Sequence, residues 1–204
     1  MSGKSVPTKP LIDRRSARTR RMLHEALMKL ILRKHYDSIT VQHIIDEADV
    51  GRATFYAHYA GKDDLLRRGF DHFRAELFET RAQRPNGDAT PQLNFSSVVF
   101  AHVERFKDIY RALVGSKASS IALREFRRLM VEAIRPEIAK CDHPRVPREL
   151  LAHFIADSIQ SVVMWWVELH PELSGAVVHE MFRELVAPVL AGACREARFA
   201  AAAA

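Results

Sequence analysis

The stretch Thr40–Leu66, TVQHIIDEADVGRATFYAHYAGKDDLL, has the pattern of two short helices joined by a tight turn and followed by a third. Thr40 is a residue type that caps helix N-termini. The apolar residues after it keep the helical period and would form one buried stripe: Val41, Ile44, Ile45 and Ala48. Asp49 and Gly51 break this helix, because both types tolerate backbone angles that other residues avoid. The stretch therefore predicts a helix-turn-helix.

The second short helix, expected over Arg52–His58, divides into an inward and an outward side. Phe55 and Tyr59 are four residues apart and face inward. The outward side carries Arg52, Thr54, Tyr56 and His58. An arginine can pair with both acceptors of a guanine edge, and a tyrosine ring can pack on a thymine methyl or bond a phosphate. The outward side therefore suits the major groove of duplex DNA.

The run VGRATFYAHYAGKDDLL, residues 50–66, resembles the recognition segment of TetR-family transcriptional regulators. A turn, a Thr-aromatic-Tyr core, a His-aromatic pair and a lysine that opens the next helix follow one another in the family's order. The specific match covers residues 14–66. The chain departs from the pattern at Asp49, where the family usually has glycine, and at Gly51, where a serine or threonine usually caps the recognition helix.

This resemblance implies roles for individual residues in DNA binding. Those that approach base edges would be Arg52, Ala53 and Tyr56. Those that hold the DNA backbone would be Thr40, Thr54, His58 and Lys62. The family also implies an all-α fold of about nine helices, with a three-helix DNA-binding domain followed by a helical domain for ligand binding and dimerisation.

The positive charge lies in the same part of the chain. Residues 1–62 hold 12 Lys or Arg against 6 Asp or Glu, whereas residues 63–204 hold 19 of each, so the whole net charge of +6 belongs to the first segment. We expect Arg14, Arg15 and Arg18 to crowd the first turns of a helix, where cations oppose the helix dipole. An anionic neighbour such as DNA phosphate would offset this cost.

The rest of the chain has helical periodicity and no strand pattern. We expect a basic tail over residues 1–13, the DNA-binding domain over 14–62, a connecting helix over 63–84 and the regulatory domain over 85–199. Asp13 or Ser16 can cap the first helix, which would run to about Lys34. Pro136 and Pro188 should end or kink the helices that contain them. The later helices are expected over residues 94–105, 107–114, 116–139, 147–169 and 174–198.

The last two helices have more apolar surface than one core requires. In the segment 147–169 one stripe holds Leu151, Ile155, Ile159, Val162 and Trp166, and a second holds Phe154, Ser161, Trp165 and Leu169. In the resembled family the last two helices pack against their mates in a four-helix interface. We expect a homodimer with interface residues Ile159, Val178, Met181, Phe182 and Leu185. A single large core is the competing interpretation.

The resemblance also implies an effector pocket in the second domain. Aromatic and flexible residues that could line it are Phe106, Phe126, Met130, His153, Phe154, Trp165 and Trp166. A helical core has the same composition. Neighbouring residues on a helix point about 100° apart, so the two tryptophans should occupy different environments. With few fixed charges in this set, we expect a small neutral or aromatic effector.

Other classes of protein find little support in the sequence. It has no Gly-rich phosphate loop, nucleophile elbow or HExxH motif, so we expect no enzyme, cofactor or metal site. Cys141 and Cys194 are far apart, so no disulfide is implied and a reducing cytoplasm is expected. No run of 18 apolar residues predicts a membrane span. Two alternatives stay open: an effector-independent DNA-binding protein, and a ligand-binding or catalytic helical protein whose basic end serves RNA or acidic partners.

Overall fold

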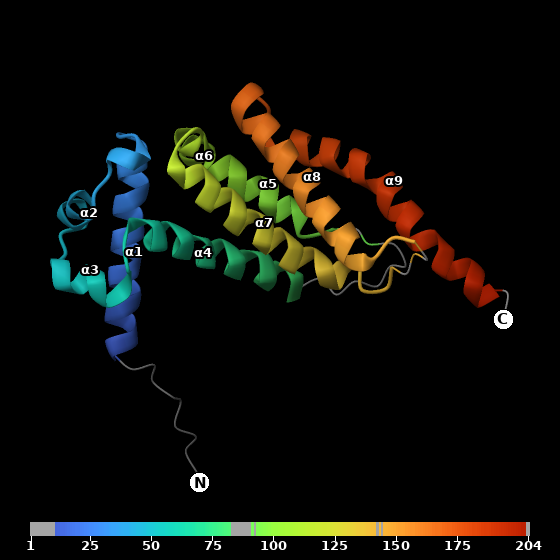
Figure 1. Ribbon diagram of the computed structural model, residues 1–204, viewed down its shortest axis with the longest axis horizontal. Helices are drawn as coiled ribbons and strands as arrows, with labels where there is room; N and C mark the ends of the chain where they lie inside the picture. Colours follow the sequence, from blue (N-terminus) through green and yellow to red (C-terminus); the bar gives the residue numbers. More distant parts are fainter. Residues whose placement is uncertain (1–10, 83–90, 92, 142, 144, 203–204) are drawn as a thin grey trace, which may run out of the picture.

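The computed structural model describes residues 11–82, 91, 93–141, 143 and 145–202, and these residues form helices without strands (Figure 1). A single 3-10 turn, η1 (Tyr36–Ser38), interrupts the α-helices. The α-helices in chain order are α1 (Leu11–Ile31), α2 (Val41–Ala48), α3 (Arg52–His58), α4 (Lys62–Ala82), α5 (Ser96–Arg105), α6 (Lys107–Leu113), α7 (Lys117–Glu137), α8 (Arg148–Leu169) and α9 (Gly175–Ala202). The predicted all-α class is confirmed.

Helices α1, α2 and α3 form a compact head at one end of the molecule (Figure 1). Its core is made of side chains from all three helices and η1, among them Leu27, Tyr36, Ile44 and Phe55. Thr40 caps α2 as expected: its hydroxyl accepts from the His43 amide at 3.2 Å, and the His43 ring accepts from the Thr40 amide. This reciprocal pair satisfies two backbone donors at the helix start.

The turn between α2 and α3 depends on one unusual backbone conformation. Asp49 ends α2 with φ 51° and ψ 52°, which is the left-handed region. Its amide donates to the carbonyls of Ile45 and Asp46 and closes the helix. Val50 then packs against the head core, where it joins the two helices. The turn follows the prediction made from residues 49–51.

Several helix limits differ from the sequence prediction. Helix α1 begins at Leu11 rather than at a cap on Asp13 or Ser16, and the Ser16 hydroxyl accepts a hydrogen bond from Arg20 instead. Pro136 lies one residue before the end of α7, as expected. Helix α9 does not end at Pro188 but continues through it, although the proline lacks an amide to donate and its ring crowds the preceding turn. Residues 1–10 of the expected tail lie outside the described part of the chain.

Helix α4 leads from the head to the second domain, whose core lies between α4, α5, α7, α8 and α9 (Figure 1). The largest buried side chains of this core are aromatic, and they include Phe73, Phe100, Phe126, Trp166 and Phe182. Helix α8 packs along α7, and α9 packs along α5. Helices α8 and α9 lie at the end of the molecule away from the head (Figure 1).

The head core also includes residues that come from the second domain. Four side chains from the corner between α6 and α7 are buried with those of α1, α2 and α3: Leu113, Ala118, Ile121 and Ala122. Phe70 of α4 packs against both cores. The side-chain packing therefore does not divide at residue 62, the boundary expected from the sequence.

The structure bears on two expectations from composition, and the second needs correction. Within the described residues, α8 is long and apolar enough to cross a membrane by length and composition, with a mean hydropathy of 1.3 over an 18-residue window. Its partial burial against α7 fits the core helix of a folded domain equally well. Cys141 is buried and disulfide-bonded, contrary to the prediction of no disulfide, because separation in sequence does not fix separation in space. The cysteine argument for a reducing compartment therefore fails.

Candidate nucleic-acid interface

Helix α3 presents a polar outer face because two aromatic residues hold its other face in the core. Phe55 and Tyr59 are buried, with ring centroids 5.9 Å apart. The outer face carries Arg52, Ala53, Thr54 and Tyr56, all exposed, whereas His58 is half-buried. The orientation predicted for α3 is confirmed. The four exposed residues form a short surface of the size that fits a major groove.

Arg52 is held in place by a residue that sequence reasoning missed. Its guanidinium lies 3.5 Å from the side-chain oxygen of Gln42 on α2 and 5.7 Å from the ring centroid of Tyr56. These neighbours orient the arginine fork along the outer face of α3. The available signal in the sequence was Gln42 itself, a polar residue outside the apolar stripe of α2.

Lys62 forms hydrogen bonds within the chain and does not belong to the exposed face of α3. Its ammonium donates to the backbone carbonyls of Tyr36 at 2.8 Å and Ile39 at 2.7 Å, with a longer contact to Asp37 at 3.3 Å. It also lies 4.5 Å from the Tyr36 ring centroid. An ammonium has three donors, and all three are used here. A DNA phosphate contact by Lys62 would require these bonds to break, so the structure gives it the role of closing η1 onto α4.

The other backbone-contact candidates lie at the surface of the head. Thr40 is exposed at the start of α2, and Arg14, Arg15 and Arg18 are exposed in the first turns of α1. Helices α1 and α3 belong to the same small head (Figure 1), and arginine cations neutralise phosphate without regard to sequence.

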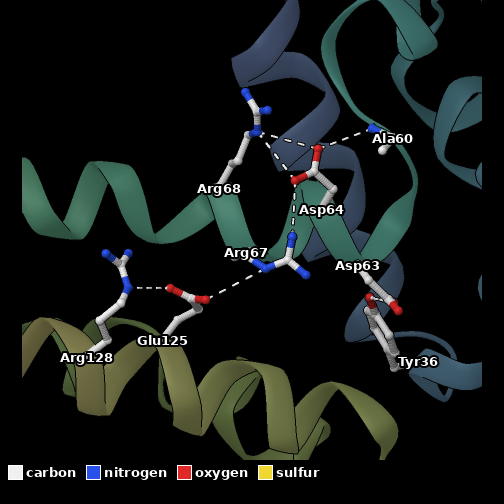
Figure 2. Close-up of polar contacts among 8 residues, drawn as sticks. All are labelled: Tyr36, Ala60, Asp63, Asp64, Arg67, Arg68, Glu125 and Arg128. Carbon is white, nitrogen blue, oxygen red and sulfur yellow. Dashed lines mark hydrogen bonds and ion pairs between the residues drawn. The ribbon is translucent and has the colours of Figure 1, made fainter.

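A chain of polar contacts runs from the end of α3 to α7 (Figure 2). The Ala60 amide, just after α3, donates to Asp64 at 3.2 Å. Asp64 pairs with Arg67 at 3.2 Å and with Arg68 at 3.4 Å. Arg67 in turn lies 3.7 Å from the buried carboxylate of Glu125. A displacement of α7 along α4 would therefore change the contacts that fix the C-terminal end of α3.

A second link joins η1 to α4 beside this chain. The Tyr36 hydroxyl donates to Asp63 at 2.7 Å, as Figure 2 shows. Burial raises the pKa of Tyr36, and the hydrogen bond to Asp63 acts in the same direction. Lys117, at the start of α7, lies 3.5 Å from the same carboxylate. Asp63 therefore holds the head, α4 and α7 at one point.

The five residues expected at a dimer interface divide into two groups. Met181 and Leu185 are exposed on α9. Ile159, Val178 and Phe182 are buried inside the protomer, so the structure removes them from the outer face. Other exposed apolar side chains lie on α8: Phe154, Trp165 and Leu169 of its second stripe, together with Leu150, with exposed fractions from 37% to 66%.

The seven residues expected to line an effector pocket do not share one cavity among the described residues. Phe106 lines a cavity beside α1, and Phe126 lines a small space of about 20 Å³ next to Gln160. Met130 and Trp166 are fully buried in the core, and the Trp166 indole donates to the Leu173 carbonyl at 2.9 Å. The remaining three, His153, Phe154 and Trp165, lie at the surface of α8 to differing degrees. The tryptophans do occupy different environments, as predicted.

No catalytic arrangement emerges from the described part of the chain. Ser96 and His179 lie 2.8 Å apart, but Ser96 is completely buried and could not meet a substrate. No group of three potential metal ligands occurs among the residues that the structure describes. The arrangement that the structure does present, an exposed α3 held by a turn on α2, is that of a helix-turn-helix DNA-binding protein.

Comparison with known proteins agrees with this class. Residues 23–68 match the family described as bacterial regulatory proteins, tetR family. The chain is 38% identical over 91 residues to the helix-turn-helix transcriptional regulator YxbF of Bacillus subtilis. That alignment covers 41% of this chain and about a quarter (24%) of the relative.

Solved structures share the whole fold. A TetR-family regulator from Syntrophomonas wolfei aligns with a TM-score of 0.69 and 22% identity over 85% of this chain and 95% of that one. The regulator FadR from Thermus thermophilus aligns with a TM-score of 0.55 and 20% identity over 82% and 92%. Residues 23–68 therefore match the TetR family of bacterial regulatory proteins, and the chain shares the fold of solved TetR-family regulators.

Proposed function

We propose that this chain is a dimeric repressor that binds a palindromic operator and leaves it when a small apolar effector binds. The observation that carries the proposal is the exposed set Arg52, Thr54 and Tyr56 on a helix anchored by buried Phe55. Each protomer would place α3 in one major groove, with half-sites about 34–36 Å apart or a little more. Its site of action would be the cytoplasm, where the DNA is.

The exposed apolar face of α8 and α9 supports a second copy of the chain as partner. Leu150, Phe154, Trp165 and Leu169 form an exposed stripe along α8. Met181 and Leu185 are exposed on α9, and Leu185 lines one groove with Phe154. Such a stripe is unfavourable in water, and a two-fold dimer would cover it with the same stripe of a second copy. Two α8 and two α9 helices would then form a four-helix interface, at the end of the molecule away from the DNA.

Control by an effector is supported by the contacts between the domains. The chain of contacts through Arg67 and Glu125 connects α7 to the end of α3. A ligand that prefers one arrangement of α4 and α7 by about 1–3 kcal/mol would change operator occupancy roughly 5- to 150-fold. FadR of Thermus thermophilus, which shares the fold, was solved in complex with lauroyl-CoA. The effector-independent alternative would be favoured by DNA binding that no small molecule changes.

The experiment begins with selection of binding sites from randomised duplexes. Arg52→Ala should then weaken binding to the selected site by about 1–3 kcal/mol and relax preference at one base pair, with little change on a scrambled duplex. The matched variant changes Arg14, Arg15 and Arg18 to Ala together. It should weaken both duplexes alike and reduce the salt dependence by roughly one slope unit for each lost phosphate contact. Equal losses on both duplexes for Arg52→Ala would contradict its base-reading role.

A further inference from the structure

A cavity of about 80 Å³ lies where the head meets the second domain. Helix α1 contributes His24 and Met28 to its wall, and α4 contributes Gly69 and Phe73. The opposite wall comes from α5 and α6, which include His102 and Tyr110. The cavity therefore touches both the helix that carries the exposed arginines and the helices of the regulatory core.

The wall beside α1 is shaped by a glycine. A Cβ atom at Gly69 would lie 2.5 Å from Nε2 of His24, closer than real Cβ contacts. The missing side chain lets the His24 imidazole sit directly against α4. His24 thereby becomes part of the cavity lining, and burial lowers its pKa, with the nearby His72 acting in the same direction.

The lining is aromatic and carries no Asp, Glu, Lys or Arg. Seven of the twelve lining residues have rings: three histidines, three phenylalanines and Tyr110. His102 stacks on Phe73 with centroids 3.8 Å apart, and Phe106 is 4.8 Å away on another side. Flat apolar walls of this kind select an aromatic ring, and the absence of fixed charge selects a neutral one.

One ring nitrogen of His102 faces a carboxylate. Its Nδ1 is shielded from solvent and lies 3.6 Å from a carboxylate oxygen of Glu76, just beyond hydrogen-bond distance. Burial lowers the pKa of His102 to about 4, so its imidazole is neutral at pH 7 and has one N–H and one acceptor nitrogen. The carboxylate favours the proton on Nδ1, which leaves Nε2 as the acceptor for a ligand hydroxyl.

We propose that this cavity binds a small phenol-like molecule, one aromatic ring with a hydroxyl that donates to His102. Its volume is well below the ~300–1,000 Å³ of sites for larger ligands, so it admits one ring and little else. The flexible Met28 side chain allows the wall to adjust to that ring. The bound ring would join α1 to α4 and α6. An effector role for this molecule rests on the proposed function. Its binding to the cavity is independent of that function.

The test uses the full chain without DNA and two matched probes, 4-fluorophenol and 4-fluorotoluene, observed by fluorine NMR titration. The phenol should bind about tenfold more tightly than the toluene, which is the value of one buried hydrogen bond. His102→Phe keeps the ring and removes the acceptor, so it should abolish this preference. His170→Phe, at an exposed histidine outside the cavity, should leave it unchanged. Met28→Phe should fill the space and weaken both probes.

Equal binding of the two probes by the unaltered chain, or a preference that survives His102→Phe, would overturn the proposal. Circular dichroism of each variant establishes that it is folded. A second arm adds 4-fluorophenol to the complex with the selected duplex. If 4-fluorophenol binds without changing the affinity for DNA, the cavity is a binding site but the ligand is not an effector. A chain without sequence-specific duplex binding would refute the proposed function, while the first arm would still decide whether the cavity binds phenols.

Discussion

Asp49 adopts a backbone conformation that suits glycine better than an L-amino acid. The left-handed region costs most side chains about 1–2 kcal/mol, and aspartate somewhat less because its short side chain can bond locally. Its negative charge also lies at the C-terminus of α2, where the helix dipole favours cations. The turn is therefore held against a local cost by its neighbours, Val50 and the α2 carbonyls.

Replacing Asp49 with glycine should stabilise the head. We expect Asp49→Gly to raise the free energy of unfolding by about 0.5–1 kcal/mol, because glycine adopts this conformation without strain. Urea unfolding followed by circular dichroism measures the change. The matched variant Asp46→Gly introduces glycine inside α2 and should destabilise by a similar amount. A midpoint for Asp49→Gly at or below that of the unaltered chain would contradict the strain argument.

Single residues of the head could be predicted wherever burial decides their direction. Phe55, Tyr59 and the α2 stripe follow from a period of 3.6, because an apolar side chain has one favourable side to face. Lys62 could not be predicted in this way. A lysine at the start of a helix can donate equally well to phosphate or to carbonyls, and the choice depends on where η1 folds back against α4.

At the scale of elements, the two apolar stripes of α8 lie in different environments. The stripe with Ile155 and Trp166 is buried in the protomer, and the stripe with Phe154 and Leu169 is exposed. The sequence predicts both stripes of α8, but it also places Ile159 of α8 and Phe182 of α9 at a dimer interface, whereas both are buried in the protomer. A helix that is apolar around most of its circumference does not indicate which stripe meets its own core; that depends on the crossing with α7 and α9.

Leu185 and Phe182 on α9 give a matched test of the exposed face. Leu185 is 69% exposed and Phe182 is buried. Leu185→Glu should leave the helical circular dichroism intact and weaken dimerisation by roughly 2–4 kcal/mol, since the dimer would bury an unpaired charge. Phe182→Glu should instead unfold or aggregate the chain. Light scattering at several concentrations measures the mass. A folded Leu185→Glu dimer of unchanged affinity would exclude this interface.

For the whole molecule, we expect the junction between the domains to lose stability in acid. An ordinary histidine in the unfolded chain takes a proton as the pH falls through about 6.5. Burial holds the pKa of His102 at about 4, with Arg105 and His72 acting in the same direction and Glu76 against it. Between these values the unfolded chain binds more protons, so the free energy of unfolding falls as the pH drops from about 6.5 to 4.

His102→Phe should remove this part of the pH dependence. We expect the unaltered chain to lose roughly 2–3 kcal/mol more than the variant between pH 7.5 and pH 4, with most of the difference appearing below pH 6. Denaturant unfolding at pH 7.5, 6.0, 5.0 and 4.0 measures both chains. His24, whose pKa is also lowered by burial, remains in the variant and leaves some dependence. Parallel curves for the two chains would show that His102 binds protons alike in the folded and unfolded states.

The corner between α6 and α7 has a consequence for how such a chain can change over evolution or in the laboratory. Leu113, Ala118, Ile121 and Ala122 complete the core of the head although they are distant from it in sequence. A chimera that joined this head at residue 62 to another regulator's second domain would leave that core open. The head and the second domain are therefore not exchangeable modules here. A successful graft would have to transfer Leu113–Ala122 together with α1, α2 and α3, and select the rest of α4 to match.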